Sequence, residues 1–559
     1  MLVGLVMQSA TLLGRELREG TGEATRSVAP DSSMRTFAHG SFLYMKGEYW
    51  GAIDTFRKIP TRTPGEAAAV HYAISMAFSS LAVPDSSRFH GEAAVRLDPG
   101  NMHYSRYLAR LAHEMQDYER AAELYGQAAI AAPDRVDILY AQALEYVAAN
   151  KPAEALEVFG QVLKLDHLDE KALSQSLWLQ IAIKHYQDAI VTLKQLIDIA
   201  GNNQKLQITL GQLYDLTGRG DMAVETFKGI IASDRNAVPA WVALFDQRIR
   251  SGSRDELLRE FREFDGLAPA DAGKVVEVTR LFANRSGHDS LYVEPVFSML
   301  DELVLRHPGD SRVHVLKGAY EMTRDRQVLA VSSFSRAVTL EPRNIEAWDG
   351  LVMAHVERQD KRMVYQTITR AKRALPRQAS RLSVLEGYAL FHTGSPARAA
   401  RVLEKAAGSK TGVKDHDLLI QANTTLAMAY EQLGSKKRSG QAYARVLELD
   451  PHNSLAMNNL AYLYAEEGIM LQKALRLAQT AVLLEPENGV FLDTLGWVHF
   501  HLGSYASARD MLEKAVATGI GEAEIYGHLG AVYEKLGESD KAREMLDRAK
   551  ALKGKPSVP

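Results

Sequence analysis

The 559-residue sequence contains no cysteine. Without a thiol there is no disulfide, no zinc site built from thiolates and no cysteine nucleophile. The lack of thiols fits an oxidising compartment of a cell envelope, where a free thiol is a liability, but chance explains it equally well. Cysteine usage therefore leaves the compartment open.

An excess of charge of one sign is missing as well. The formal net charge is −3 and the pI is near 6.6. We therefore expect no general attraction to nucleic acid or to an anionic membrane. Binding to either would need a local patch of basic residues.

Long hydrophobic runs are also absent. The apolar stretch at residues 1–13 is broken by Gln8, Ser9 and Thr11, is too short to span a bilayer, and has no preceding basic residue. Two interpretations stay open for residues 1–32: a degenerate or truncated export signal with a linker, or a segment without such a role, which is either a disordered tail or an apolar arm that covers the first structural unit. We predict no transmembrane helix in this chain. Membership of a membrane-associated complex stays open.

The common catalytic motifs are not found. The sequence has no phosphate-binding glycine-rich loop followed by Lys and Ser or Thr, no His-Glu-x-x-His zinc helix and no nucleophile-elbow serine. We therefore expect a protein that is not an enzyme and that uses no cofactor and no metal ion.

What the sequence does contain is one interval, repeated. Ala121, Ala155, Ala189 and Ala223 follow one another in steps of 34 residues. The same step recurs near the end of the chain, in the pairs Leu495 and Leu529, Gly496 and Gly530, and Ala508 and Ala542. A fixed period of this length indicates stacked copies of one supersecondary unit. Such copies leave little room for a separate catalytic domain.

One well-formed copy shows what the unit is. Leu210 and Tyr214 are four residues apart and share a helical face, and Ala223 and Phe227 do the same on a following helix. Gly218 lies between them, where a residue free to adopt positive φ ends the first helix. Small residues at the eighth and twentieth positions of the unit allow the two helix axes to approach closely.

The pattern resembles the tetratricopeptide-repeat family, whose motif places Trp, Leu, Gly, Tyr, Ala, Phe, Ala and Pro in this order. The copy from Met102 matches it with Leu108, Ala109, Ala121, Tyr125, Ala128 and Pro133. The copy from Ile345 matches it with Trp348, Leu351, Ala371 and Pro376. The resemblance implies an all-α fold, an α-solenoid wound as a right-handed superhelix of about fifteen helix-turn-helix units, with first helices lining an inner groove.

Following the register along the chain predicts unit starts near residues 33, 68, 102, 136, 170, 204, 238, 272, 311, 345, 380, 420, 454, 489 and 523. The predicted organisation is an N-terminal apolar segment and linker (1–32), an N-terminal array (33–270), a degenerate repeat with an insertion (271–310), middle units (311–407), a lengthened connection (408–419), a C-terminal array with a closing helix (420–553) and a tail (554–559). The two lengthened places are either hinges or surface insertions without consequence.

The C-terminal units resemble tetratricopeptide proteins common in Gram-negative cell envelopes. If the geometry of that family holds, seven side chains of the first helices face the inner groove and form a candidate partner-binding surface: Asn458, Asn459, Tyr462, Asp493, Trp497, His501 and His528. Tyr and Trp bury a large area at little entropic cost, and Asn pairs with both donors and acceptors of an extended backbone. The alternative is that Tyr462 and Trp497 only pack between adjacent first helices.

A second candidate surface is basic. Between residues 358 and 381, a single acidic residue, Asp360, is accompanied by eight basic ones: Arg358, Lys361, Arg362, Arg370, Lys372, Arg373, Arg377 and Arg381. This concentration would attract an acidic protein segment or an anionic polymer. The alternative is a solvated convex face with no ligand.

From these patterns we expect a non-enzymatic scaffold that binds partner peptides in its groove during assembly or secretion of an envelope complex. We expect it in the periplasm or cell envelope rather than in the cytoplasm. The alternative function is a regulatory or targeting subunit of a polysaccharide synthesis or export machinery, with the basic patch facing an anionic partner.

Overall fold

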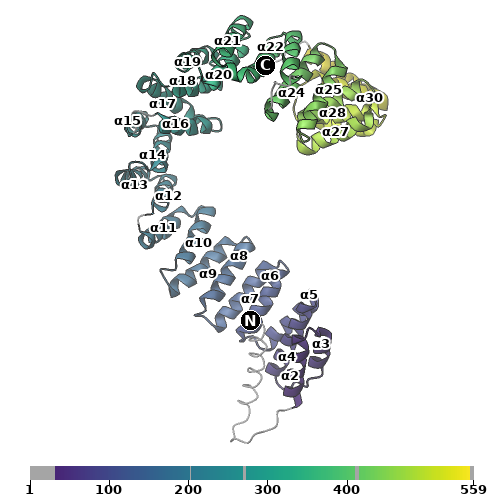
Figure 1. Ribbon diagram of the computed structural model, residues 1–559. Coiled ribbons are helices and arrows are strands. Elements are labelled where there is room, and N and C mark those ends of the chain that lie inside the picture. The colour runs from purple at the N-terminus through teal and green to yellow at the C-terminus, as the bar shows by residue number, and fades with distance from the viewer. Residues whose placement is uncertain (1–31, 202, 268–271, 409–414, 554–559) are drawn as a thin grey trace. The chain divides into compact units, whose positions relative to one another are not determined.

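The computed structural model describes residues 32–201, 203–267, 272–408 and 415–553 (Figure 1). The predicted tail and nearly all of the predicted N-terminal segment lie outside these residues. The chain divides into two compact bodies, which we name the N-terminal body (residues 1–260) and the C-terminal body (residues 261–559). The finer division predicted from the sequence stays a prediction.

The N-terminal body contains α2 (Ser32–Met45), α3 (Tyr49–Arg57), α4 (Pro64–Ser80), α5 (Pro84–Leu97), α6 (Met102–Glu114), α7 (Tyr118–Ala131), α8 (Val136–Ala148), α9 (Pro152–Leu165), α10 (Glu170–Ala182), α11 (Tyr186–Ala200), α12 (Gln204–Leu216), α13 (Gly220–Ser233) and α14 (Val238–Arg250). Helix α15 (Arg254–Asp265) contains the division between the bodies.

The C-terminal body continues with α16 (Gly273–Arg285), the short 3-10 helix η1 (Ser290–Tyr292), α17 (Val293–Arg306), α18 (Ser311–Met322), α19 (Gln327–Leu340), α20 (Ile345–Glu357), α21 (Lys361–Ala374), η2 (Pro376–Gln378), α22 (Ala379–His392) and α23 (Pro396–Gly408). It ends with α24 (His416–Gln432), α25 (Lys436–Leu449), α26 (Ser454–Glu466), α27 (Leu471–Leu484), α28 (Gly489–His501), α29 (Tyr505–Ala517), α30 (Ala523–Leu536) and α31 (Ser539–Lys553). All regular structure in the described ranges is helical, which confirms the predicted all-α fold.

The helices follow one another as first and second helices of fifteen units within the described part of the chain. Ten first helices begin at the predicted residue, and the other five begin within four residues of it. Helix α4 begins four residues early because Pro64 occupies its first turn and the Thr63 hydroxyl accepts a hydrogen bond from the Glu66 N–H. Helix α24 begins four residues early because Asp415 caps it in the same way.

In six of the described units, a contact between glycine and a large side chain fixes the helix pair. Glycine occupies the eighth position of six units, at Gly40, Gly211, Gly318, Gly387, Gly496 and Gly530, and a large apolar side chain occupies the twenty-fourth. A Cβ atom added to Gly211 would lie 2.3 Å from Phe227, and one added to Gly387 would lie 2.3 Å from Leu403. The first helix therefore packs with its backbone directly against the large side chain of the second.

Except in the unit of α16 and α17, the turn inside each described unit has one backbone conformation at its fifteenth residue. The fifteenth position has φ of +75° at Gly218 and +78° at Gly503, as predicted for a helix-ending glycine. Lys184 and Gln116 occupy the same position in their units with φ of +62°. Since a side chain disfavours this left-handed region, packing of the two helices imposes the turn even where glycine is absent.

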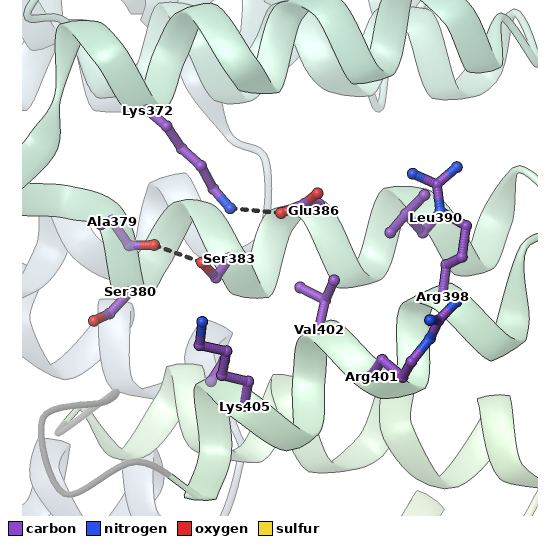
Figure 2. Close-up of a pocket in the computed structure, with 11 residues that line it drawn as sticks. Lys372, Ala379, Ser380, Ser383, Glu386, Leu390, Arg398, Arg401, Val402 and Lys405 are labelled. Atoms are coloured by element: carbon purple, nitrogen blue, oxygen red, sulfur yellow. Dashed lines mark hydrogen bonds and ion pairs between the residues drawn. The ribbon is translucent and has the colours of Figure 1, made fainter.

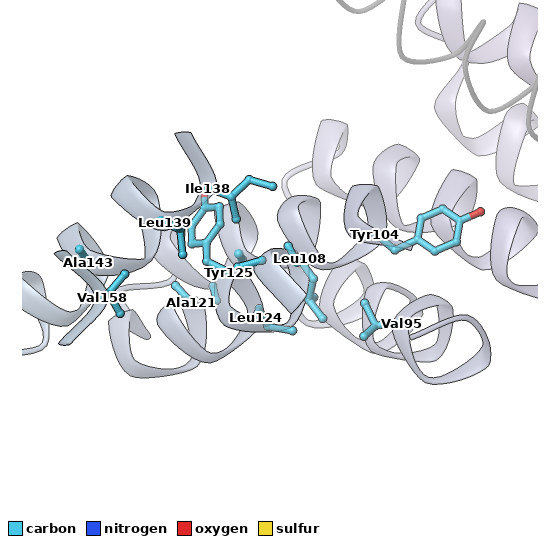
Figure 3. Packing of buried hydrophobic residues seen from close by; sticks show 14 of the residues in the cluster. Val95, Tyr104, Leu108, Ala121, Leu124, Tyr125, Ile138, Leu139, Ala143 and Val158 are labelled. Atoms are coloured by element: carbon cyan, nitrogen blue, oxygen red, sulfur yellow. The ribbon is translucent and has the colours of Figure 1, made fainter. Parts of the chain in front are cut away.

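Neighbouring units share one core. In the N-terminal body, a continuous cluster of buried side chains runs from α4 to α10, and Figure 3 shows Leu108, Leu124 and Ile138 among its members. Ala121 and Ala155 lie in the same cluster with no exposed surface. Each unit therefore buries its apolar face largely against its neighbours, as the repeat predicted.

Both lengthened places are built into the packing of the C-terminal body. The extra residues between α16 and α17 include η1, and they are held where Ser286 accepts a hydrogen bond from the Tyr320 hydroxyl (3.0 Å). In the second place, residues 416–419 belong to α24, and residues 409–414 lie outside the described residues. This helical extension places Leu418 next to the first helices of the preceding units.

The glycine contact gives a first prediction. Gly211→Ala should lower the free energy of unfolding by about 1–3 kcal/mol, because its methyl group collides with Phe227. Gly229→Ala on α13 is the matched control: no atom lies within 4 Å of its added Cβ, so it should stabilise the helix by about 0.5–1 kcal/mol. Urea unfolding measures both. Equal effects of the two variants would contradict the proposed packing constraint.

Candidate functional site

Three consecutive first helices, α26, α28 and α30, carry the predicted groove residues, and the structure brings most of them together. The Trp497 ring stacks on the His528 ring, with centroids 3.9 Å apart and an interplanar angle of 16°. His501 meets the edge of Trp497 at 4.8 Å, and Tyr462 lies 6.3 Å from His528. These four rings form one aromatic cluster across neighbouring units.

Most polar groups of this cluster are hydrogen-bonded, whereas Nε2 of His501 is buried without a hydrogen-bond partner among the described residues. Asp493 is buried and its two carboxylate oxygens lie 2.9 and 3.1 Å from His528 Nδ1. The Trp497 indole N–H donates to Glu466 at 2.8 Å, and the Tyr462 hydroxyl donates to Glu524. Burial raises the pKa of Asp493, while its bond to His528 opposes that rise. The cluster is a preorganised network rather than a row of free side chains.

The two asparagines extend this network toward α25. Asn459 donates to the Tyr443 hydroxyl at 2.9 Å, and Asn458 donates to Asn459 at 3.2 Å. Asn458 is 3% exposed, so it packs inside the array. Asn458 and Asp493 are buried, whereas Tyr462, Trp497 and His501 are half-exposed. Whether Tyr462 and Trp497 bind a partner or only pack between first helices stays a prediction.

An open stretch of groove lies on the preceding first helices, α20, α22 and α24. A cleft of about 540 Å³ runs across them. Its half-buried apolar wall is formed by Met353, Leu385, Tyr388, Leu418, Ile420 and Met428. At one end, Arg381 donates to Asp349 at 2.6 Å, and burial raises the pKa of Asp349.

Sequence reasoning missed this cleft, although the signal was present. Tyr462 and Trp497 are the ninth residues of their units, and the ninth residues of the three earlier units are Met353, Tyr388 and Met428. All three line the cleft. The same unit positions therefore face the groove in both stretches, and applying the register to every unit would have found them.

The eight residues of the predicted basic patch do not share one surface. Arg381 lines the inner cleft just described, while Lys372 lines a different cleft on the side of the second helices. The Arg370 guanidinium lies 5.5 Å from the centre of the Trp348 ring. The other members, Arg358, Lys361, Arg362, Arg373 and Arg377, are exposed on α21 and its ends.

The described residues contain no cluster of three or more His, Asp, Cys or Glu arranged to hold a metal ion. None of their helices is both long and apolar enough to cross a membrane.

The family pattern described as tetratricopeptide repeat matches residues 92–136, 180–245, 420–453 and 494–557. A TPR repeat-containing protein of Pseudomonas aeruginosa, PA4667, is 26% identical over 165 residues, which are 30% of this chain and 27% of that protein. The human protein O-mannosyl-transferase TMTC1 is 30% identical over 134 residues, which are 24% of this chain and 15% of that protein. The matches thus span about a quarter or less of either relative.

Two solved structures are similar over most of the chain. The structure of Naa15/Naa10 bound to HypK-THB covers 94% of both chains at 12% identity with a TM-score of 0.37. Yeast Tom70 covers 78% of this chain and 96% of its own at 15% identity with a TM-score of 0.34.

The Asp493–His528 pair gives a second prediction. Asp493→Ala should lower the free energy of unfolding by about 1–3 kcal/mol, because it leaves the buried His528 ring nitrogen without its acceptor. Glu524→Ala removes an exposed partner of Tyr462 and should change the unfolding free energy by less than about 1 kcal/mol. Urea unfolding compares them. A wild-type midpoint for Asp493→Ala would show that the pair does not support the fold.

Proposed function

This chain is a tetratricopeptide-repeat protein, and from that premise we propose that it is a scaffold whose inner groove binds a peptide segment of a partner protein. The observation that carries the proposal is the open cleft of about 540 Å³ on α20, α22 and α24. Its wall offers half-buried apolar side chains that a partner would cover fully, and burial of apolar area favours binding.

The proposed occupant is an extended segment with apolar side chains spaced along it. Groove residues recur once per unit, as the alignment of Met353, Tyr388 and Met428 shows. An extended peptide can place one side chain against each unit, and the Asp349–Arg381 pair offers polar groups at the end of the row. The aromatic cluster of Tyr462, Trp497 and His528 then forms a second, already filled part of the same groove, to which a longer segment would add contacts.

The setting of this function is part of the proposal. We propose that the scaffold acts in the assembly or secretion of a bacterial envelope complex, supported by the resemblance of its C-terminal units to envelope tetratricopeptide proteins. The likeness to a Pseudomonas aeruginosa repeat protein is consistent with a bacterial setting.

We propose binding rather than catalysis as the activity. The repeat units occupy the described residues almost entirely, and the human transferase is matched over only 15% of its length. Purified protein supplied with a mannosyl donor and an acceptor peptide should therefore give no mannosylated product by mass spectrometry. Reproducible turnover, abolished by a point substitution in this chain, would overturn the proposal.

Site-specific crosslinking tests the groove. A photoreactive phenylalanine derivative in place of Tyr388 should crosslink one partner segment in cells of the native organism. The same group in place of Phe89, a 62% exposed aromatic residue on the second helix α5, should not. The crosslinked segment is then made as a synthetic peptide for calorimetry.

The affinity of that peptide for variants of this chain tests whether the peptide binds in the inner cleft. Met428→Glu should weaken it at least about tenfold, because a carboxylate would be buried in the apolar wall. Leu483→Glu on the second helix α27 adds the same charge at a 78% exposed position and should leave the affinity unchanged. Equal effects of the two variants would place the peptide outside the groove.

A further inference from the structure

A second cleft, of about 530 Å³, lies between the second helices α21 and α23, with α22 as its floor (Figure 2). Four cationic side chains line it, Lys372 from α21 and Arg398, Arg401 and Lys405 from α23. One carboxylate, Glu386, lines it as well. Four positive charges against one negative charge make the cleft strongly cationic.

The structure does not neutralise this charge internally. Lys372 pairs with Glu386 at 2.5 Å, which uses the carboxylate that the cleft contains. The one carboxylate on α23, Glu404, faces elsewhere: it accepts a hydrogen bond from Tyr430 and lies 3.9 Å from Arg438. Within the described residues, Arg398, Arg401 and Lys405 have no carboxylate within ion-pair distance.

This arrangement differs from that of the next second helix, α25. On α25, Lys436, Arg438 and Arg445 each lie within ion-pair distance of a glutamate. On α23, the three cations at steps of three and four residues lie on one face of the helix and repel one another. A bound anion would relieve that repulsion.

Two further features favour an anion. Ala379 and Ser380, the first residues of α22, line the cleft, and no side chain caps this helix. The N–H groups of an uncapped first turn add partial positive charge to that end of the cleft. Figure 2 shows the Lys405 side chain extending from α23 into the cleft toward the side of Ser383.

The apolar part of the lining indicates which kind of anion fits the cleft. Leu390, Val402 and Ala406 give the cleft apolar surface between its cations. The Tyr365 ring of α21 lies 5.9 Å from the Arg398 guanidinium, but among the described residues no aromatic side chain lines the cleft itself. The cleft therefore has no aromatic platform on its own wall on which single-stranded nucleic acid could stack its bases. A chain with carboxylates next to aliphatic side chains matches both the charge and the apolar surface.

We propose that this cleft is a second binding site, separate from the inner groove, for an acidic peptide segment of a partner protein with glutamate or aspartate next to leucine-like residues. None of its lining residues belongs to the inner cleft. The acidic segment places its carboxylates against Arg398, Arg401 and Lys405 and its aliphatic side chain against Leu390 and Val402.

The test uses the full chain and a fluorescein-labelled eight-residue peptide of alternating glutamate and leucine. Fluorescence anisotropy should show binding that weakens as salt is raised, and the peptide with glutamine in place of glutamate should not bind. Lys405→Glu should weaken binding at least about fivefold. Glu386→Gln should strengthen it, because it removes the competing carboxylate and frees Lys372.

Matched controls separate the site from general electrostatics and from the inner groove. Lys437→Glu makes the same charge change at an exposed lysine of the next second helix, α25, and should leave affinity within about twofold. Tyr388→Ala, in the inner cleft, should also leave it unchanged. Absence of binding, equal losses for Lys405→Glu and Lys437→Glu, or binding of polygalacturonate but not of the peptide would each overturn the proposal.

Discussion

The close approach of the two helices in each unit is the constraint on which the rest of the structure depends. Where the eighth residue is glycine, the aromatic or leucine side chain at the twenty-fourth position rests on the backbone of the first helix. The buried alanine at the twentieth position, such as Ala223, closes the pair from the other helix. A hydrophobic contact that tolerates no extra methyl group thus sets the spacing of the helices more firmly than any hydrogen bond between them.

This spacing determines which side chains line the inner face. Once the first helices lie side by side, their ninth residues form a row with one member per unit. On α26 and α28 the row is occupied by Tyr462 and Trp497, and beside it the His528 ring of α30 stacks on Trp497 and is hydrogen-bonded to Asp493. On α20, α22 and α24 the corresponding residues are Met353, Tyr388 and Met428. These side chains do not form a stacked row, and they line the open cleft instead.

The sequence predicted the fold well because its signals are local and repeated. The spacing of Ala121, Ala155 and Ala189 depends only on the unit itself, and so the helix starts followed to within four residues. The candidate sites were harder to predict, because they depend on contacts between units. The burial of Asp493 results from His528, which is 35 residues away, and the cationic cleft depends on Glu404 facing Tyr430 rather than the cations of its own helix.

The residue with positive φ in the turn has a consequence for the evolution of such a repeat chain. At the fifteenth position, glycine and residues such as Gln116 and Lys184 adopt nearly the same φ, so in every described unit except that of α16 and α17 the turn keeps one geometry whatever its residue. A gene segment encoding one unit can then be duplicated or deleted while the flanking units keep their shape. The unit of α16 and α17 differs: Ser286 occupies this position with φ of −63°, and η1 lengthens the turn. Duplication or deletion of this unit would therefore change the geometry of the neighbouring units.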